Sequence, residues 1–501
     1  MTRREFLRLL GHASLAAPAL VGSTACSPVL TRTDTTTGLS LCYVAGDVTP
    51  DGAMVWLRAE PNSQVFLHYS KEWSLGDFSS IGPFPVDENA DCTALIKLEK
   101  LEPATTYYYR VAVAGKQPGH VARFVTAPRP DDAAKVSFCC SADMRESYKP
   151  FTVMSAIRAQ RPDFFLNLGD TIYADRGGTA HHLAEFWSKY RANREDAATQ
   201  LCFDEISTYV TWDDHEVADD YLPRNPLAPI GRKAFLDYWP IRRNLEEPQR
   251  IYRSFRWGKA LELFILDARQ YRDRKHGTML GQNQKEWLFE GVSRSGAIFK
   301  FIATSVPMVG GGSDRWDGYP RERTEILEYI REKKITGVIF LSGDLHCAAI
   351  TRIPKSNGLR DITAGPLAAP LNRITNGTAS RYEFFEAENF NFAKITVDPK
   401  VEPVHALVEF IDQDNRLFHS TKISPASPTA LTFTKDLARQ AATKNMEDPS
   451  YISPLGRREE RGLVRKSFVE RGFDLGDHCQ VRLERLRSAS GLTTRVSLPS
   501  R

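Results

Sequence analysis

The sequence has little net charge and no stretch in which positive charge is concentrated. Its 501 residues carry 66 Lys and Arg against 62 Asp and Glu, a formal net charge of +4 at pH 7. Nucleic-acid-binding domains usually gather Lys and Arg on one face, often between aromatic residues. We therefore expect no nucleic-acid partner. The composition, 42% hydrophobic and 26% charged, is that of a soluble globular chain long enough for two or three domains.

Cysteine is also scarce, and its spacing is irregular. The eight cysteines form no zinc-finger or small disulfide-scaffold pattern. In an exported chain Cys42 and Cys92 could form a disulfide within a small β domain. Cys139 and Cys140 lie in an apolar run and Cys347 adjoins another, so we expect buried free thiols there.

Internal repeats and a nucleotide phosphate loop are missing as well. The Gly-rich stretch "GGGSDRWDGYP" at 310–320 lacks the spacing of a nucleotide-binding loop. We interpret it as a flexible lid or substrate loop. Its Trp316 is then either a pocket wall or an exposed loop aromatic.

The N-terminus has an apolar run too short, and too interrupted by Gly and Pro, to span a membrane. Arg3-Arg4 is followed by Phe6-Leu7, the run "LAAPALVG" and small residues, which is typical of a twin-arginine signal over residues 1–26. Cys26 resembles a lipoprotein cleavage site, so attachment to a membrane through a lipid on Cys26 is one alternative. We expect a periplasmic, cell-surface or secreted monomer.

Three further segments follow the signal. Residues 27–37 are rich in Thr and Ser and predict a linker. Residues 38–128 contain short β-forming runs between turn residues, and "LEPATTYYYRVAVAG" resembles the tyrosine corner of immunoglobulin-like or fibronectin-like sandwiches. Residues 135–424 alternate apolar strands with helices, which predicts an α/β domain. Residues 425–501 form a charged extension that ends in a strand pair or a frayed tail.

Polar residues stand where several predicted strands of the α/β domain end. Ligands of open α/β sheets gather at the carboxyl ends of the strands. Carboxylates, imidazoles and phenolates converging there are suited to hard or borderline metal ions. In chain order these residues are Asp143, Asp170 with Tyr173, Asp213-Asp214-His215, Asp267 with Arg269, and Asp344 with His346.

At this point the chain resembles the alkaline phosphatase D family, a branch of the calcineurin-like metallophosphoesterases. The motifs that carry the resemblance are "DFFLNLGDTIYAD", "TWDDHEVADDY", "FILDARQYR" and "IFLSGDLHC". The resemblance covers roughly residues 40–420. It implies a four-layer α/β/β/α core preceded by a β-sandwich, with two metal ions that hydrolyse phosphate mono- or diesters.

The resemblance also implies roles for individual residues. Asp170 would bridge the two metals, and Asp143, Tyr173, Asp214, Asp344 and His346 would be the remaining ligands. His215 would assist the leaving oxygen, and Asp267 and Arg269 would orient the phosphate. Within "VTWDDHEVADDY" we expect Asp213 and Glu216 to brace their neighbours, and Asp219 and Asp220 to be solvated surface acids.

One position departs from the family pattern. The family usually has a cysteine that ligates iron as a thiolate where "FCCSAD" places Ser141. The metals expected from the family are iron and calcium, but loss of the thiolate opens the site to Mn or Zn. Two alternatives to a general phosphoesterase stay open: a phospholipase-type diesterase, and a non-catalytic envelope binding protein with a degenerate esterase core.

Overall fold

A computed structural model describes residues 36–39, 42–310, 312–372, 382–425, 484–488 and 491–495. The predicted signal segment, Cys26 and most of the linker lie outside these residues. The chain divides into two units, Met1–Thr432 and Phe433–Arg501. In the second unit, β21 (Glu484–Ser488) and β22 (Gly491–Arg495) form an antiparallel pair, in keeping with one of the two alternatives for this segment. No helix among the described residues is both long and apolar enough to cross a membrane.

The N-terminal part of the first unit is all β, as predicted. In β6 buried and half-buried residues alternate along the whole strand, because one face of its sheet covers a core and the other meets solvent. Tyr107 accepts a hydrogen bond from the backbone N–H of Glu102 (2.9 Å), which ties the start of β6 to the preceding turn. The seven strands are β1 (Val44–Thr49), β2 (Gly52–Arg58), β3 (Gln64–Ser70), β4 (Ser79–Pro85), β5 (Thr93–Leu98), β6 (Thr106–Val113) and β7 (Ala122–Val125).

The sandwich is not separate from the α/β part. Strands β4-β3-β6-β7 form one sheet, whereas β1, β2 and β5 complete a nine-stranded sheet in the order β20-β19-β18-β8-β9-β10-β1-β2-β5. Gly46 of β1 pairs in parallel with Thr208 of β10, and this pairing joins the two parts. The remaining strands of this sheet are β8 (Val136–Ser141), β9 (Phe164–Asn167), β10 (Ser207–Val210), β18 (Asn391–Val397), β19 (Ala406–Asp412) and β20 (Leu417–Ile423).

A seven-stranded sheet in the order β11-β12-β13-β14-β16-β15-β17 packs against the nine-stranded one. Strands β9, β10, β13 and β14 are buried along their whole length because both faces of their sheets are covered. The strands of this second sheet are β11 (Arg253–Trp257), β12 (Leu261–Ile265), β13 (Phe299–Ala303), β14 (Val338–Ser342), β15 (Ala348–Arg352), β16 (Arg360–Thr363) and β17 (Tyr382–Glu386).

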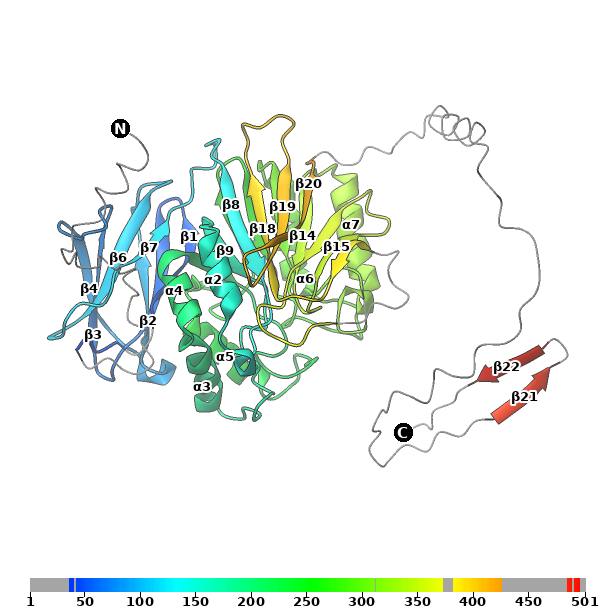
Figure 1. Ribbon diagram of the computed structural model, residues 1–501, viewed down its shortest axis with the longest axis horizontal. Coiled ribbons are helices and arrows are strands. Elements are labelled where there is room, and N and C mark those ends of the chain that lie inside the picture. The colour runs from blue at the N-terminus through cyan, green and yellow to red at the C-terminus, as the bar shows by residue number, and fades with distance from the viewer. Residues whose placement is uncertain are drawn as a thin grey trace, which may run out of the picture. The chain divides into compact units, whose positions relative to one another are not determined.

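Helices cover the outer face of each sheet, and this completes the predicted four-layer α/β/β/α core (Figure 1). Helices α2–α5 pack on the nine-stranded sheet through one apolar cluster, and α6 and α7 pack on the seven-stranded sheet through another. A third cluster fills the space between the sheets and continues into the sandwich. The helices are α2 (Thr152–Ala159), α3 (Leu183–Arg194), α4 (Ala197–Glu205), α5 (Ala228–Tyr238), α6 (Gly281–Arg294) and α7 (Pro320–Glu332).

The cysteines follow this layering. Cys139, Cys140 and Cys347 are buried free thiols, as predicted. Cys42 and Cys92 are also free, so the disulfide considered for this pair is absent. The reason is their position: Cys42 packs toward the helices and Cys92 packs between the sheets.

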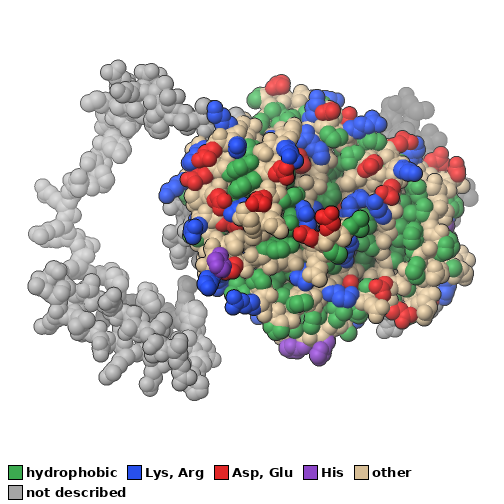
Figure 2. All heavy atoms as spheres, turned by 180° about the vertical axis from the view of Figure 1, so that it is seen from behind, with side chains coloured by type: hydrophobic (Ala, Val, Ile, Leu, Met, Phe, Trp, Pro, Cys, Tyr) green, Lys and Arg blue, Asp and Glu red, His purple; other side chains and the backbone are tan. Residues whose placement is uncertain are grey.

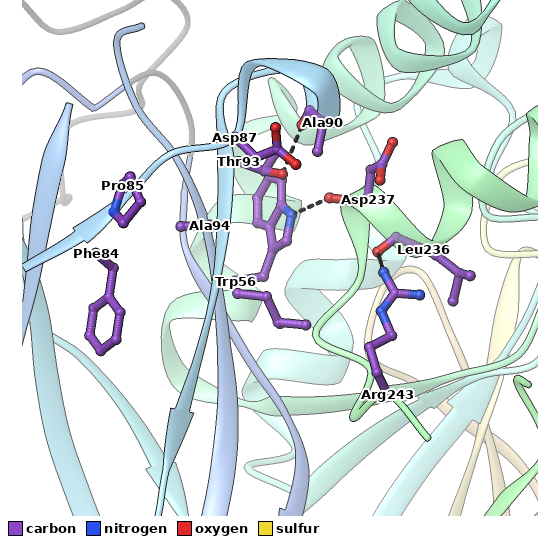
Figure 3. A pocket seen from close by; sticks show the side chains of 11 residues that line it. Trp56, Phe84, Pro85, Asp87, Ala90, Thr93, Ala94, Leu236, Asp237 and Arg243 are labelled. Carbon is purple, nitrogen blue, oxygen red and sulfur yellow. Dashed lines mark hydrogen bonds between the residues drawn. The ribbon is translucent and has the colours of Figure 1, made fainter. Parts of the chain in front are cut away.

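The surface mixes charge types. On the face shown in Figure 2, acidic and basic side chains are interspersed with hydrophobic ones. A pocket of about 330 Å³ lies between β2, β5 and α5, where Trp56 donates to the backbone oxygen of Asp237 (2.7 Å) and Arg243 lines the opposite wall (Figure 3). None of its lining residues is one of the predicted metal ligands.

Candidate metal centre

Three neighbouring strands deliver carboxylates to one edge of the nine-stranded sheet. Strands β8, β9 and β10 run parallel and in register, with Ser141 and Val210 both opposite Asn167. Asp143, Asp170 and Asp214 follow these strands by two to four residues. Because parallel strands end at the same edge, the three side chains meet there.

Four of the predicted ligands have a left-handed backbone. The φ angles are +67° for Asp143, +52° for Asp170, +60° for Asp344 and +53° for His346. Residues other than glycine rarely adopt this conformation, and it concentrates at functional sites. Gly365 is needed beside them, since a Cβ there would lie 2.7 Å from a carboxylate oxygen of Asp143.

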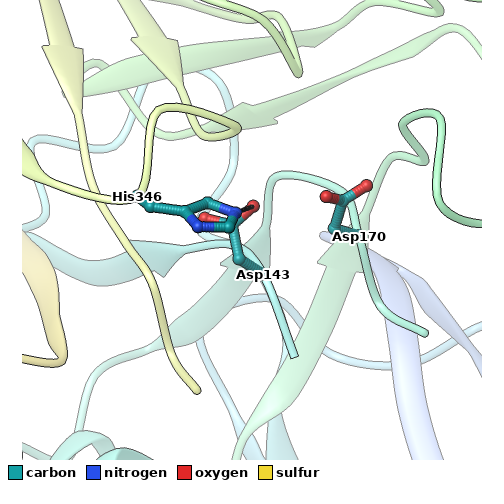
Figure 4. A group of neighbouring side chains, drawn as sticks. All are labelled: Asp143, Asp170 and His346. Carbon is teal, nitrogen blue, oxygen red and sulfur yellow. Dashed lines mark ion pairs between the residues drawn. The ribbon is translucent and has the colours of Figure 1, made fainter. Parts of the chain in front are cut away.

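Asp170 belongs to two groups of ligand atoms, each group lying within 4.8 Å. One group is Asp143, Asp170 and His346, drawn in Figure 4, where the imidazole lies against Asp143 and Asp170 faces them from the neighbouring loop. The other is Asp170, Asp214 and His215. A third group joins Asp213 and Asp214 to Asp344. A carboxylate shared by two groups is what a bridged pair of metal ions requires.

The imidazole of His346 is held in the tautomer that a metal ligand needs. Its Nδ1 lies 2.5 Å from the carbonyl oxygen of Pro370, which can only accept, so Nδ1 carries the proton. Its Nε2 then presents a lone pair, 3.2 Å from the hydroxyl of Tyr173 and 3.7 Å from Asp143. Burial lowers the pKa of His346 and favours this neutral form.

The cluster lacks the positive charge that its carboxylates need. Both oxygens of Asp143 and one each of Asp213 and Asp214 are buried without a hydrogen-bond donor. Burial raises the pKa of Asp143 well above its usual range, and the neighbouring Asp344 and Asp213 raise it further. Burial and the charge of Asp214 do the same to Asp170. Bound cations would satisfy these orphaned oxygens and reverse the repulsion, so the residues present fit metal ions.

His215 lies beside this cluster and is oriented by Asp175. Its Nδ1 is 2.7 Å from Asp175, its backbone N–H points to Asp170 (3.3 Å), and its ring lies 4.1 Å from that of Tyr173. Burial alone would lower the pKa of His215, but the hydrogen bond to Asp175 and the charge of Asp214 outweigh it and raise the pKa. The protonated form of the imidazole is therefore favoured.

The residues flanking Asp214 brace the loop. Glu216 accepts from the backbone N–H (2.6 Å) and hydroxyl (2.7 Å) of Thr171 and from the backbone N–H of Asp213 (2.8 Å). Asp213 accepts from Ser305 (2.7 Å) and pairs with Arg269. These contacts agree with the bracing expected of Asp213 and Glu216, although Asp213 also lies within a ligand group. Asp219 and Asp220 are exposed.

Arg269 and Asp267 contact other protein groups, whereas a pair that binds phosphate would need donors open to the substrate. The guanidinium of Arg269 is fully buried and pairs with Asp213, with Asp314 (2.9 Å) and with Asp214 (3.4 Å). Burial would raise the pKa of Asp214, but Arg269 overrides it and lowers that pKa to about 2. Asp267 accepts from Trp212 (2.9 Å) and from two backbone N–H groups of its own turn. Orientation of phosphate by this pair stays a prediction; the contacts are those of positioning residues.

Ser141 is the last residue of β8, two residues before Asp143, and its hydroxyl is used in a hydrogen bond to the backbone. Its hydroxyl donates to the backbone oxygen of Asn391 (2.7 Å). Burial raises the pKa of the neighbouring thiols Cys139 and Cys140, which disfavours their thiolate forms. The ligand groups found among the described residues contain oxygen and nitrogen donors and no sulfur.

Sequence reasoning missed three residues that the structure places at the site. Asp175 orients His215, and its only signal was the second acid of "GDTIYAD". Asp314 forms an ion pair with Arg269, and Arg315 forms one with Asp344. Both come from the stretch that we interpreted as a lid. Trp316 of that stretch is fully buried and donates to Thr304 (3.0 Å), so the exposed-aromatic alternative for it was wrong.

The two facing sheets, the outer helices and the acidic strand ends define a metallophosphoesterase fold. The purple acid phosphatase PPD1 from yellow lupin (Lupinus luteus) seeds has a similar structure, with a TM-score of 0.60 and 15% identity over 77% of this chain and 75% of that one. The solved structure of PhoD gives a TM-score of 0.68 and 19% identity over 82% of this chain and 99% of that one.

The sequence itself identifies the family. The model of the PhoD-like phosphatase family matches residues 136–392, and the model of its N-terminal domain matches residues 25–128. The chain therefore belongs to the PhoD-like phosphatase family, and the resemblance found in its motifs is confirmed. Alkaline phosphatase D of Bacillus subtilis (strain 168) is 25% identical over 376 residues, which span 62% of this chain and 64% of that protein.

Proposed function

We propose that the protein is a metal-dependent phosphoesterase that hydrolyses phosphate esters at the strand-end cluster. The observation that supports this most strongly is the sharing of Asp170 between two groups of ligand atoms, one of which contains the buried Asp143 carboxylate with no donor to either oxygen. Membership of the PhoD-like phosphatase family supports the same reaction class.

In this proposal Asp143, Tyr173 and His346 would hold one ion, Asp214 and Asp344 would hold a second, and Asp170 would contribute to both. Bound ions would polarise the phosphoryl oxygens and lower the pKa of a water nucleophile. Proton donation and positioning of the ligands would come from the protein's own side chains. Asp175 orients His215 through Nδ1, so that the imidazole can deliver a proton to the leaving oxygen. Arg269 keeps Asp213 and Asp214 in place.

The ligand chemistry also bears on which metals bind. Carboxylate, phenol and imidazole donors suit Mn, Zn, Ca and Fe, whereas the thiolate that favours iron has no counterpart at Ser141. Iron with calcium is what the family resemblance implies. Burial and nearby carboxylates raise the pKa of Tyr173 well above its usual range, so its phenol would ionise only against a cation.

The test removes the shared ligand and one imidazole. Asp170→Ala and His346→Ala, each reconstituted with Mn, Zn, Fe or Ca, should lose turnover of aryl phosphate monoesters and diesters by more than about a hundredfold, since even outer-shell changes at metal sites cost 10–100-fold. Asp131→Ala removes an exposed carboxylate and should leave turnover unchanged. Retained turnover in both site variants would overturn the proposal.

The same assay addresses substrate class and the non-catalytic alternative. Comparing an aryl monoester, an aryl diester and phosphatidylcholine ranks monoesterase, diesterase and phospholipase activity. Wild-type protein that retains no metal, and gains no turnover when Mn, Fe or Ca is added, would instead support the binding-protein alternative.

A further inference from the structure

We propose that Arg145 is the substrate-binding arginine of this site and contacts the non-bridging oxygens of the phosphoryl group. The inference rests on the proposed function and deepens it. Arg145 follows Asp143 by two residues, so the strand that delivers a candidate ligand also delivers this guanidinium. Its backbone N–H donates to the carbonyl oxygen of Ala368 (2.8 Å), which fixes the loop against residues 365–368.

The side chain of Arg145 lies at the edge of the ligand cluster. Its guanidinium carbon is 5.9 Å from the centre of the Tyr173 ring, on the face of that ring. The hydroxyl of the same tyrosine lies 3.2 Å from Nε2 of His346. Arg145 is half-buried, whereas Tyr173 and Asp143 are buried. The guanidinium is therefore partly open to solvent and lies beside one candidate ligand.

Arg145 differs from the other arginines around the cluster in what it contacts. The guanidinium of Arg269 pairs with three carboxylates, Arg272 pairs with Asp314, and Arg315 pairs with Asp344. Within the part of the chain that the structure describes, Arg145 forms no ion pair and its side chain has no hydrogen-bond acceptor. Its Nε–H is buried and unsatisfied.

The chemistry of this arrangement selects an anion with several oxygens. A cation–π contact uses the face of a guanidinium. It leaves the N–H groups, which lie in the plane of the guanidinium, free to donate. Two of those donors match two oxygens of a phosphate or a phosphate ester in a bidentate contact. Arg269, in contrast, is fully buried and lies within ion-pair distance of three carboxylates, so it is not open to solvent as Arg145 is. Arg145 can thus provide the contact that the sequence motifs had suggested for Arg269.

The first measurement is equilibrium binding of inorganic phosphate to the metal-loaded protein by calorimetry. Arg145→Ala should weaken phosphate binding about ten- to a hundredfold, the range expected for a charge-assisted hydrogen bond. Arg145→Lys should recover part of the affinity, because lysine keeps the positive charge but lacks the two parallel N–H donors of the guanidinium. Arg129→Ala, which removes an exposed arginine before the α/β domain, should bind phosphate like the wild type.

Kinetics separates binding from a purely structural role. Arg145→Ala should raise both KM for an aryl phosphate and the inhibition constant of phosphate, while metal content and melting temperature stay at wild-type values. An Arg145→Ala protein whose phosphate affinity lies within twofold of the wild type would overturn the inference, and so would a wild type that binds no phosphate. Wild-type protein that binds phosphate but hydrolyses no ester would contradict the proposed function and leave the role of Arg145 measurable.

Discussion

Two groups of buried carboxylates lie side by side in this protein, and they are satisfied in different ways. Asp213 and Asp314 pair with Arg269, although one oxygen of Asp213 has no donor, and Asp267 accepts N–H groups from Trp212 and its own turn. Both oxygens of Asp143, in contrast, have no donor. Asp143, Asp213 and Asp267 each follow a strand end closely, so the same local pattern produces a structural group and a group that needs a cation.

The difference shows that the partner of a buried carboxylate, rather than its position after a strand, indicates its function. A buried charge is stable when it is paired and hydrogen-bonded, and is costly otherwise. The paired group should therefore stabilise the metal-free protein. The unpaired group should destabilise the metal-free protein and stabilise it only when metal is bound.

The largest expected effect comes from breaking the paired group. Arg269→Met leaves Asp213, Asp214 and Asp314 without their shared cation, and we expect the metal-free protein to lose about 3–5 kcal/mol of apparent unfolding free energy. Urea unfolding in the presence of a chelator measures this. Arg129→Met should change the value by less than about 0.5 kcal/mol. Equal stability of the two variants would remove the distinction between the groups.

A smaller effect of opposite sign is expected at the unpaired group. Burial, and then Asp344, raise the pKa of Asp143, so its ionised form is disfavoured in the folded state. The stability that this acid contributes is present below its unfolded pKa and is lost as the pH rises. Asp143→Asn should therefore stabilise the metal-free protein at neutral pH by about 1–3 kcal/mol, the cost of an unsatisfied buried polar group.

Bound metal should reverse the order of stability of the wild type and Asp143→Asn. With Mn or Ca added, the wild type should gain more in melting temperature than Asp143→Asn, because the variant lacks a carboxylate ligand. Melting curves from pH 4 to 8, with and without metal, test both statements. A metal-free variant less stable than the wild type at pH 7 would contradict the first.

The smallest effect concerns His215, whose ring is hydrogen-bonded to Asp175. Asp175 raises the pKa of His215, so a reaction that needs its proton should slow as the pH rises through that pKa. Asp175→Asn should lower kcat about tenfold or more, within the range for general acids, and shift the alkaline limb of the kcat profile to lower pH. An unshifted limb would show that another group donates the proton.

Much of the fold could be predicted from the sequence, because apolar strands that end in polar residues follow from local patterns. The β-sandwich and an α/β domain were predicted from such runs, and the four-layer core was implied by the resemblance of the motifs to a known family. The continuation of β1, β2 and β5 into the nine-stranded sheet was not predicted. It depends on the pairing of Gly46 with Thr208, residues far apart in the chain.

At the site, the sequence indicated which residues approach one another but not what each contacts. Asp143, Asp170, Asp214, Asp344 and His346 meet as the motifs suggested. Asp175 was missed because its partner His215 lies in another loop. Arg269 and Arg145 could not be distinguished in the sequence, since a buried ion pair and a free guanidinium differ only in their surroundings.

The sequence by itself determined the layers of this protein, its family and the residue types at its strand ends, because strand periodicity and motif spacing are local properties of the chain. Tertiary structure alone decided which acids are neutralised by arginine, which lack a partner, and which guanidinium is free to bind an anion. The physical reason is that charge pairing in a buried site depends on distances of a few ångströms between segments, and the order of residues along one segment does not specify those distances.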